Sequence, residues 1–262
     1  MSEEIVKYTT SAIAEMTNGI ILANYEKTYS IQEEYQSESQ LETKLIENLI
    51  SQGYERFRVN SNEDLYKNLR VQIEKLNKIS FTNDEWKRFL VEYLDSPNDG
   101  MIEKTRKIQE NHIHDFIFDD GHLKNIKIID KANIHNNFLQ VVSLVKQKGT
   151  HNNRYDVSIL VNGLPLVHIE LKKRGTSIQE AFNQIHRYSK ESFNSDNSLY
   201  KYVQIFVISN GTYTRYFANT TRGNKNNYEF TCEWADAKNR VIRDLEDFTK
   251  TFFERRTILE VL

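Results

Sequence analysis

Two carboxylates and a lysine stand around a single Asn-Gly pair, and their types and spacing suit phosphodiester chemistry. Asp156 begins the mostly apolar run 156–161, and Glu170 and Lys172 end the run 164–172. Adjacent carboxylates repel each other and are costly unless a cation lies between them. Their hard oxygen atoms suit Mg²⁺, which accepts one or two carboxylates and keeps several waters. A lysine beside such a cation can orient or deprotonate an attacking water and offset the charge of a phosphate.

The Asn162-Gly163 pair predicts a β-hairpin between these two runs. A two-residue turn would set polar residues opposite apolar ones, so we expect a three-residue loop, 162–164. Its register pairs Val157 with Ile169, Ile159 with Val167, Val161 with Pro165, Ser158 with His168, Leu160 with Leu166 and Asp156 with Glu170. Opposed residues lie about 4.5–5.5 Å apart at Cβ, so this register brings the two carboxylates together. Lys172 belongs to the same face.

An E-x-K triplet alone is weak evidence in a chain of which 27% is charged. Two further triplets, Glu42-Thr43-Lys44 and Glu85-Trp86-Lys87, fall inside helical patterns. Only the triplet at Glu170 ends an apolar strand whose partner carries an aspartate at the matching position. On residue types alone, a surface hairpin with charges at its open end remains an equal alternative.

A helix is predicted directly after the hairpin. The segment Ser177-Ile178-Gln179-Glu180 has the sequence of a capping box, and apolar residues at helical spacing follow it. Gln184 and Tyr188 are four residues apart and therefore share one face of this helix.

A strand bearing E-x-K followed by a helix bearing Q-x-x-x-Y resembles the PD-(D/E)xK nuclease superfamily, in its RecB-like branch. More specifically, the chain resembles the N-terminal nuclease domain of the R (restriction and motor) subunit of type I restriction enzymes. The resemblance covers nearly the whole chain and rests on the segments LPLVHIELKKRG (164–175), AFNQIHRY (181–188), FVISNG (206–211) and RYFANT (215–220). Tyr155 stands in place of the proline that names the superfamily, which is a common variation.

This resemblance implies a Mg²⁺-dependent endonuclease domain that hydrolyses phosphodiester bonds of duplex DNA within a type I site-specific deoxyribonuclease. Asp156 and Glu170 would bind Mg²⁺, and Lys172 would assist the attacking water. Gln184 and Tyr188 would orient Lys172 or the DNA backbone.

Glu42 has two alternative roles. The segment Ser39-Gln40-Leu41-Glu42 has the sequence of a capping box at the start of a helix with a Leu41, Leu45 and Leu49 stripe. Glu42 would then be part of the cap. The resemblance offers a supporting role instead, because related nucleases often carry a metal-facing glutamate on the helix before the sheet.

DNA binding would depend on a local basic patch, because the formal net charge of −2 gives no global attraction to nucleic acid. The candidates around the proposed site are Lys173, Arg174, Arg187 and Lys190. Alternatively, these four charges are solvated surface residues at the rim of the site and do not bind DNA.

The sequence holds no G-x-x-x-x-G-K-[ST] phosphate loop. We therefore expect ATP to bind only in the full-length subunit and not in this fragment. The resemblance implies four partners: duplex DNA, the motor domains of the same subunit, and methyltransferase and specificity subunits. The alternative from another functional class is a non-catalytic module that binds DNA or a motor domain.

Length, composition and the spacing of apolar residues limit the folds that the chain can adopt. The 262 residues are 39% hydrophobic, which suits one nuclease domain, 1–262, with a helical insertion at about 61–100. The single cysteine, Cys232, favours a cytoplasmic location, and no run is long enough to span a membrane. We expect an α/β fold: a central mixed β-sheet flanked by helices, with a restriction-endonuclease-like core.

Three apolar runs, 116–118, 126–129 and 138–145, are expected to enter this sheet ahead of the hairpin. A second hairpin is expected around Asn210-Gly211, between strands at 202–209 and 212–217. The spacing of apolar residues from Val241 to Phe252 predicts a closing helix.

Overall fold

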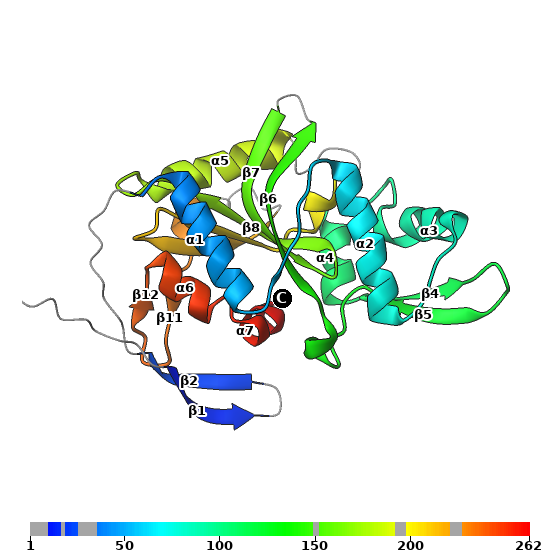
Figure 1. Ribbon diagram of the computed structural model, residues 1–262, viewed down its shortest axis with the longest axis horizontal. Coiled ribbons are helices and arrows are strands. Elements are labelled where there is room, and N and C mark those ends of the chain that lie inside the picture. The colour runs from blue at the N-terminus through cyan, green and yellow to red at the C-terminus, as the bar shows by residue number, and fades with distance from the viewer. Residues whose placement is uncertain (1–9, 17–18, 26–35, 149–151, 192–197, 221–226) are drawn as a thin grey trace, which may run out of the picture.

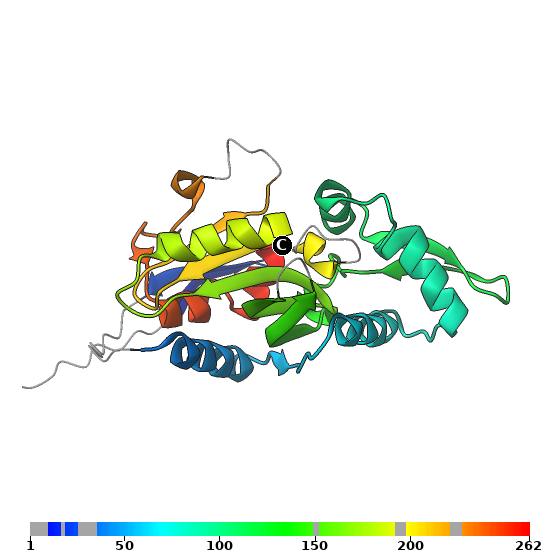
Figure 2. The ribbon, with the colours of Figure 1, turned by 90° about the horizontal axis from the view of Figure 1, so that it is seen from above.

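A six-stranded mixed β-sheet lies between helices (Figures 1 and 2), as predicted. The computed structural model describes residues 10–16, 19–25, 36–148, 152–191, 198–220 and 227–262. For residues 10–16, 19–25, 144–148, 152–155 and 189–191, it describes only the course of the backbone. No helix in these ranges is both long and apolar enough to cross a bilayer.

The strand order of the sheet is β10-β9-β8-β7-β6-β3. Its strands are β3 (Glu55–Arg56), β6 (Leu139–Lys148), β7 (Asn152–Val161), β8 (Leu164–Leu171), β9 (Ile205–Ser209) and β10 (Thr214–Ala218). The pairs β6–β7, β7–β8 and β9–β10 are antiparallel, whereas β8–β9 and β3–β6 are parallel. All eight residues of β8 are buried, as expected for a strand with covered faces at the middle of a sheet.

Helices cover both faces of the sheet (Figure 2). Helix α5 (Ile178–Glu191) lies on one face, and α1 (Glu38–Ser51) lies on the other. The predicted stripe of α1, Leu41, Leu45 and Leu49, is buried. The predicted cap of α1 is wrong: Ser37 is the N-cap, and its capping box is completed by Gln40.

A block of helices precedes β6 in the chain. It consists of α2 (Asn62–Asn77), α3 (Asn83–Phe89), the π-helix η1 (Leu90–Leu94) and α4 (Met101–Gln109). Helices α2 and α3 begin at capping boxes formed by Ser61 with Asp64 and by Thr82 with Glu85. Glu85, the first residue of one of the two other E-x-K triplets, is therefore engaged in a helix cap.

The runs at 116–118 and 126–129 do not enter the central sheet, so this expectation is wrong for two of the three runs. Strands β4 (Ile113–Ile117) and β5 (Leu123–Lys127) form a separate two-stranded sheet at the edge of the molecule (Figure 1). Phe116 and Phe118 pack against Phe81, which precedes α3. The third run forms β6 and joins the central sheet as expected.

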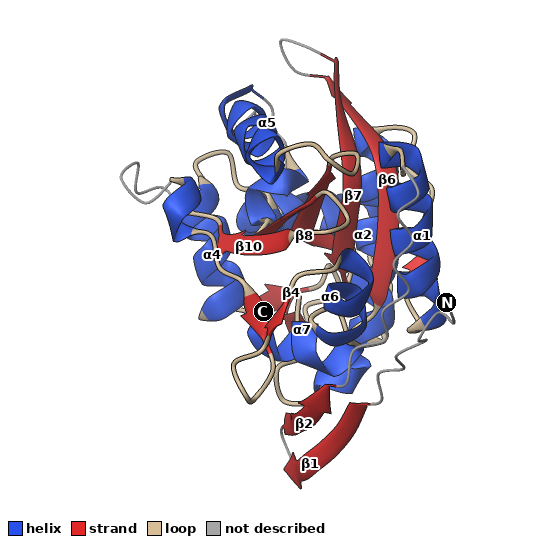
Figure 3. Ribbon diagram, turned by 90° about the vertical axis from the view of Figure 1, so that its left-hand side faces the viewer, coloured by secondary structure: helices blue, strands red, loops and turns tan. Residues whose placement is uncertain are grey.

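The C-terminal part of the chain also differs from the expected closing helix. Val241–Ile242 form strand β12, which pairs with β11 (Trp234–Ala235). Asp244 then caps α6 (Leu245–Thr251), and α7 (Arg255–Val261) follows. The second hairpin forms as expected, although Ser209 pairs with Thr214 and leaves a four-residue loop. A hairpin of β1 (Thr10–Met16) and β2 (Gly19–Tyr25) lies apart from the central sheet (Figure 3).

Short helical turns complete the chain. They are η2 (Ile134–Asn136), η3 (Leu199–Tyr202) and η5 (Tyr228–Phe230). Of these, η3 matters to the site, because it places the Tyr200 hydroxyl 3.2 Å from Ser158 Oγ on β7.

Candidate active site

The β7–β8 hairpin turns at Asn162 and Gly163 alone, so the predicted three-residue loop is wrong. The pairs nearest the turn are Val161 with Leu164 and Leu160 with Pro165. Asn162 and Gly163 both have positive φ, 50° and 84°, as the favoured two-residue hairpin turn requires. A Cβ atom at Gly163 would lie 2.6 Å from the Cα atom of Leu69 on α2. Glycine is therefore needed here for space as well as for backbone conformation.

A β-bulge lies between the turn and the carboxylates. One additional residue of β8, Leu166, is accommodated between the Leu160–Pro165 and Ile159–Val167 pairs. Beyond the bulge, the pairs Ile159–Val167, Ser158–His168 and Val157–Ile169 are those predicted. The same register, continued by one residue, places Asp156 opposite Glu170.

Asp156, Glu170 and Lys172 come together at the end of this hairpin. Asp156 Oδ2 accepts a hydrogen bond from the backbone amide of Leu171 at 2.8 Å. Lys172 Nζ lies 3.1 Å from Glu170 Oε1 and donates to the Leu171 carbonyl oxygen at 3.1 Å. The three side chains therefore form one cluster, whose catalytic role is a prediction.

The electrostatics of this cluster favour a bound cation. Burial raises the pKa of Asp156 to about 7, and the charge of Glu170 adds to the shift. Burial likewise raises the pKa of Glu170, although Lys172 partly opposes it. Glu170 is fully buried, and its Oε2 atom has no hydrogen-bond partner in the described part of the chain. A fully buried carboxylate with an unbonded oxygen, next to the half-buried carboxylate of Asp156, fits Mg²⁺, a hard cation that takes oxygen ligands.

Helix α5 carries Gln184 and Tyr188, and its Tyr188 packs on the face of the sheet that carries His168. Gln184 Nε2 donates to the Tyr188 hydroxyl at 2.5 Å. The Tyr188 ring is buried and lies edge-on to His168, with ring centroids 6.3 Å apart. Burial raises the pKa of Tyr188 to about 12, with a further contribution from the charge of Glu170. Tyr188 therefore lies near the carboxylates, and Gln184 bonds it from the same face of the helix, as the helical spacing indicated.

Helix α1 also brings Glu38 toward the cluster. Glu38 Oε1 lies 3.9 Å from Lys172 Nζ, and the charge of Glu38 contributes to the raised pKa of Glu170. Glu42 is half-buried one turn further along α1 and takes no part in the cap. Sequence reasoning missed Glu38 because it placed the helix start two residues late. Its four-residue spacing from Glu42 was the available signal.

The basic candidates lie in different surroundings. Lys173 and Arg187 are exposed. Arg174 instead joins segments of the protein: its Nε donates to Gln36 Oε1 at 3.0 Å, and its guanidinium lies 3.9 Å from Asp244. The side chain of Lys190 lies outside the described residues.

His168 is a second residue near the cluster that sequence reasoning did not assign. It is fully buried on β8, two residues before Glu170, and burial lowers the pKa of His168 to about 4. Its imidazole is therefore neutral near pH 7. The available signal was its position on the same strand face as Glu170 and Lys172.

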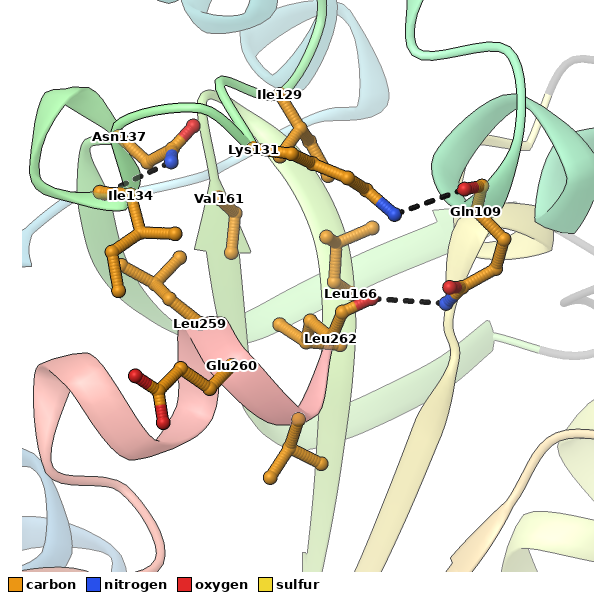
Figure 4. A pocket seen from close by; sticks show the side chains of 11 residues that line it. Gln109, Ile129, Lys131, Ile134, Asn137, Val161, Leu166, Leu259, Glu260 and Leu262 are labelled. Carbon is orange, nitrogen blue, oxygen red and sulfur yellow. Dashed lines mark hydrogen bonds between the residues drawn. The ribbon is translucent and has the colours of Figure 1, made fainter. Parts of the chain in front are cut away.

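A cavity of about 280 Å³ lies at the other end of the hairpin (Figure 4). Val161 and Leu166 line it from the turn end, and α7 closes it from the opposite side. The polar groups at its rim are already bonded: Lys131 Nζ donates to the Gln109 carbonyl at 3.0 Å, and Gln109 Nε2 donates to the Leu262 carbonyl at 2.9 Å. None of Asp156, Glu170 and Lys172 lines the cavity, so it is separate from the carboxylate cluster.

Comparison with known proteins identifies the family. Residues 35–225 match the family described as type I restriction enzyme R protein N terminus. This match includes the β7–β8 hairpin, α5 and the cluster built on them.

Two relatives show how much of their own length the chain covers. It is 56% identical over 254 residues to the type I restriction enzyme EcoprrI endonuclease subunit of Escherichia coli, covering 97% of this chain and 81% of that relative. It is 37% identical over 223 residues to the SsaAORF53P endonuclease subunit of Staphylococcus saprophyticus, covering 83% of this chain and 23% of that relative. The chain thus spans about a quarter of the staphylococcal subunit. The family match and both relatives confirm the resemblance to the N-terminal domain of type I R subunits, and the chain belongs to the family of type I restriction enzyme R protein N termini.

Proposed function

We propose that this chain is a Mg²⁺-dependent endonuclease domain that hydrolyses phosphodiester bonds of duplex DNA within a type I restriction enzyme. One observation carries the proposal: the carboxylates of Asp156 and Glu170 meet across a hairpin, with Lys172 3.1 Å from Glu170. The relatives, which are named as endonuclease subunits, support the nuclease assignment.

Each residue of the cluster has a distinct role in this proposal. Asp156 and Glu170 would hold the cation, which when bound polarises a phosphate oxygen and lowers the pKa of a water. The Leu171 amide fixes the orientation of Asp156 by its 2.8 Å hydrogen bond. Lys172 would hold the attacking water and offset the charge that develops on the phosphate.

The surrounding residues would bind and orient the DNA. Gln184 and Tyr188 lie on α5 beside the carboxylates and would orient Lys172 or the DNA backbone. Lys173 and Arg187 are exposed and available to phosphates, and Lys190 remains a candidate. Arg174 already bonds Gln36, so it would act more by holding the loop that follows β8 than by direct contact.

The proposal extends to the complete enzyme. Motor domains of the same subunit, methyltransferase subunits and specificity subunits would be its partners in the cytoplasm. Because the sequence holds no phosphate loop, ATP would be bound elsewhere in the full-length subunit. The purified chain should accordingly show no ATP hydrolysis, with or without DNA.

The first experiment is a calorimetric titration of the purified chain with Mn²⁺ and Mg²⁺. Wild-type protein should bind a divalent cation, and Asp156→Ala and Glu170→Ala should not. Circular dichroism establishes that both variants remain folded. A non-catalytic interaction module predicts instead that the wild type and the variants give the same, negligible heat.

A further inference from the structure

We propose that His168 is a positioning residue that orients the Glu170 carboxylate for metal binding, and that Ser158 and Tyr200 hold the imidazole in the required orientation. The inference rests on the proposed metal site. It assigns to His168 no contact with the substrate.

A buried row of polar groups leads from the core to Glu170. Tyr200, Ser158, His168 and Glu170 are each at most 1% exposed. The Tyr200 hydroxyl lies 3.2 Å from Ser158 Oγ, and Ser158 Oγ lies 3.1 Å from His168 Nδ1. On the other side of the ring, His168 Nε2 lies 3.6 Å from Glu170 Oε2. The row therefore ends at the carboxylate oxygen that has no hydrogen-bond partner in the described residues.

The chemistry of the row gives it a direction. An ionised carboxylate only accepts hydrogen bonds, so the imidazole atom facing it must carry the proton. With the proton on Nε2, Nδ1 accepts from Ser158 Oγ, and Ser158 Oγ in turn accepts from the Tyr200 hydroxyl. The opposite direction would turn the Nε2 lone pair toward Glu170 Oε2. The proton on Nε2 is thus the arrangement compatible with a metal-binding, ionised Glu170.

The hairpin and the surrounding rings fix the imidazole in place. Ser158 and His168 are directly paired across β7 and β8, so their contact is set by the sheet register. The rings of Tyr188, Tyr200 and Phe206 each lie edge-on to His168 with centroids 6.3 Å away. The separation of 3.6 Å to Glu170 Oε2 exceeds that of a hydrogen bond. In the proposed arrangement, the carboxylate rotates so that this separation closes to a hydrogen bond.

A pair of substitutions separates this role from simple core packing. In His168→Gln, the side-chain amide nitrogen reaches approximately the position of Nε2 and can still donate to Glu170. In His168→Asn, the shorter amide reaches only the position of Nδ1, so the contact with Ser158 is kept and the donor to Glu170 is lost. Both substitutions remove the ring, so both should lower the melting temperature by similar amounts.

The readout is Mn²⁺ affinity, measured by calorimetry on folded variants of the purified chain. We expect His168→Asn to bind Mn²⁺ about 10- to 100-fold more weakly than the wild type, the usual effect of losing a hydrogen bond to a metal ligand. His168→Gln should retain most of the affinity. Equal affinities for the wild type and His168→Asn would overturn the proposal, as would equal losses in both variants.

A second variant keeps the test informative if the His168 variants do not fold. Tyr200→Phe removes one hydroxyl at the far end of the row and preserves the ring. It should weaken Mn²⁺ binding by about fivefold, the factor that corresponds to one hydrogen bond. An unchanged affinity would count against the row. If the wild type itself binds no Mn²⁺, the proposed metal site fails; if only the His168 and Tyr200 variants behave as wild type, the site stands and this inference fails.

Discussion

The carboxylate of Asp156 accepts a 2.8 Å hydrogen bond from the backbone amide of Leu171, the residue that separates Glu170 from Lys172. Because Leu171 is fully buried, this bond connects β7 to a part of β8 that is fixed by the core. Asp156 therefore cannot shift relative to Glu170 and Lys172 without moving the strand that carries them. The proposed metal ligands and the proposed catalytic lysine are thus held as one rigid unit.

Loss of either carboxylate should abolish DNA cleavage. In the full-length enzyme, Asp156→Ala and Glu170→Ala should each lower the cleavage rate by at least about 10³-fold, because charge stabilisation by a metal is worth several kcal/mol. The matched control is Asp115→Asn, an exposed carboxylate on β4, which should cut normally. Normal cutting by Asp156→Ala or Glu170→Ala would remove these residues from the site.

Lys172 should be needed for the chemical step but not for binding of the cation. Lys172→Ala should slow cleavage by about 10²- to 10⁴-fold, the usual contribution of a general acid or base. Mn²⁺ affinity, measured by calorimetry, should not fall. Lys87 belongs to the other E-x-K triplet on α3 and its side chain is 74% exposed, so Lys87→Ala should leave both quantities unchanged. A Lys172→Ala enzyme that cuts at the normal rate would refute the role.

The sequence predicted the hairpin and the meeting of its charged residues because strand alternation and opposed side chains are local properties. It failed at the turn, where two acceptable rules conflicted. Asn-Gly favours a two-residue turn, whereas the pairing of like residues required one more residue. The bulge at Leu166 allows both the two-residue turn and the pairing of like residues beyond it. No residue type in the sequence indicates this bulge.

The errors elsewhere arose from packing partners that are distant in sequence. Phe116 and Ile126 have the spacing of sheet residues, but Phe116 packs against Phe89 of α3, and Ile126 pairs with His114 in the separate β4–β5 sheet. The sequence has capping patterns at both Ser37 and Ser39, and the structure uses Ser37. Because Ser39 was predicted as the cap, Glu38 was placed outside the helix. Local propensity thus found the elements, whereas tertiary contacts decided where they pack.

The carboxylates of Asp156 and Glu170 should make the metal-free protein less stable as pH rises. Burial raises the pKa values of Asp156 and Glu170 to about 7, above the ~4 of an unfolded chain. Their contribution to stability is therefore fully present below about pH 4 and is lost as pH rises through 7. In EDTA, Asp156→Asn should raise the melting temperature at pH 8 and have little effect at pH 5.

Thermal melts over this pH range provide the measurement, with about 2–4 °C expected for each kcal/mol of relieved repulsion and burial cost. Asp115→Asn on the exposed β4 strand serves again as the control and should show no such pH dependence. Mg²⁺ should stabilise the wild type at pH 8 but not Asp156→Asn. A stabilising effect of Asp156→Asn that is equal at pH 5 and pH 8 would contradict the electrostatic origin.

Gln184 and Tyr188 should support catalysis without binding the metal. Their side chains bond each other at 2.5 Å, and Tyr188 lies close enough to Glu170 to feel its charge. Mg²⁺ with two carboxylates prefers water at its remaining positions. Gln184→Ala and Tyr188→Phe in the full-length enzyme should therefore slow cleavage by about 10²-fold, the cost of a misplaced catalytic group, while Mn²⁺ affinity stays unchanged. Gln179→Ala, an exposed position on the same helix, is the control. If both variants cut as fast as this control, the pair serves only to pack α5 against the sheet.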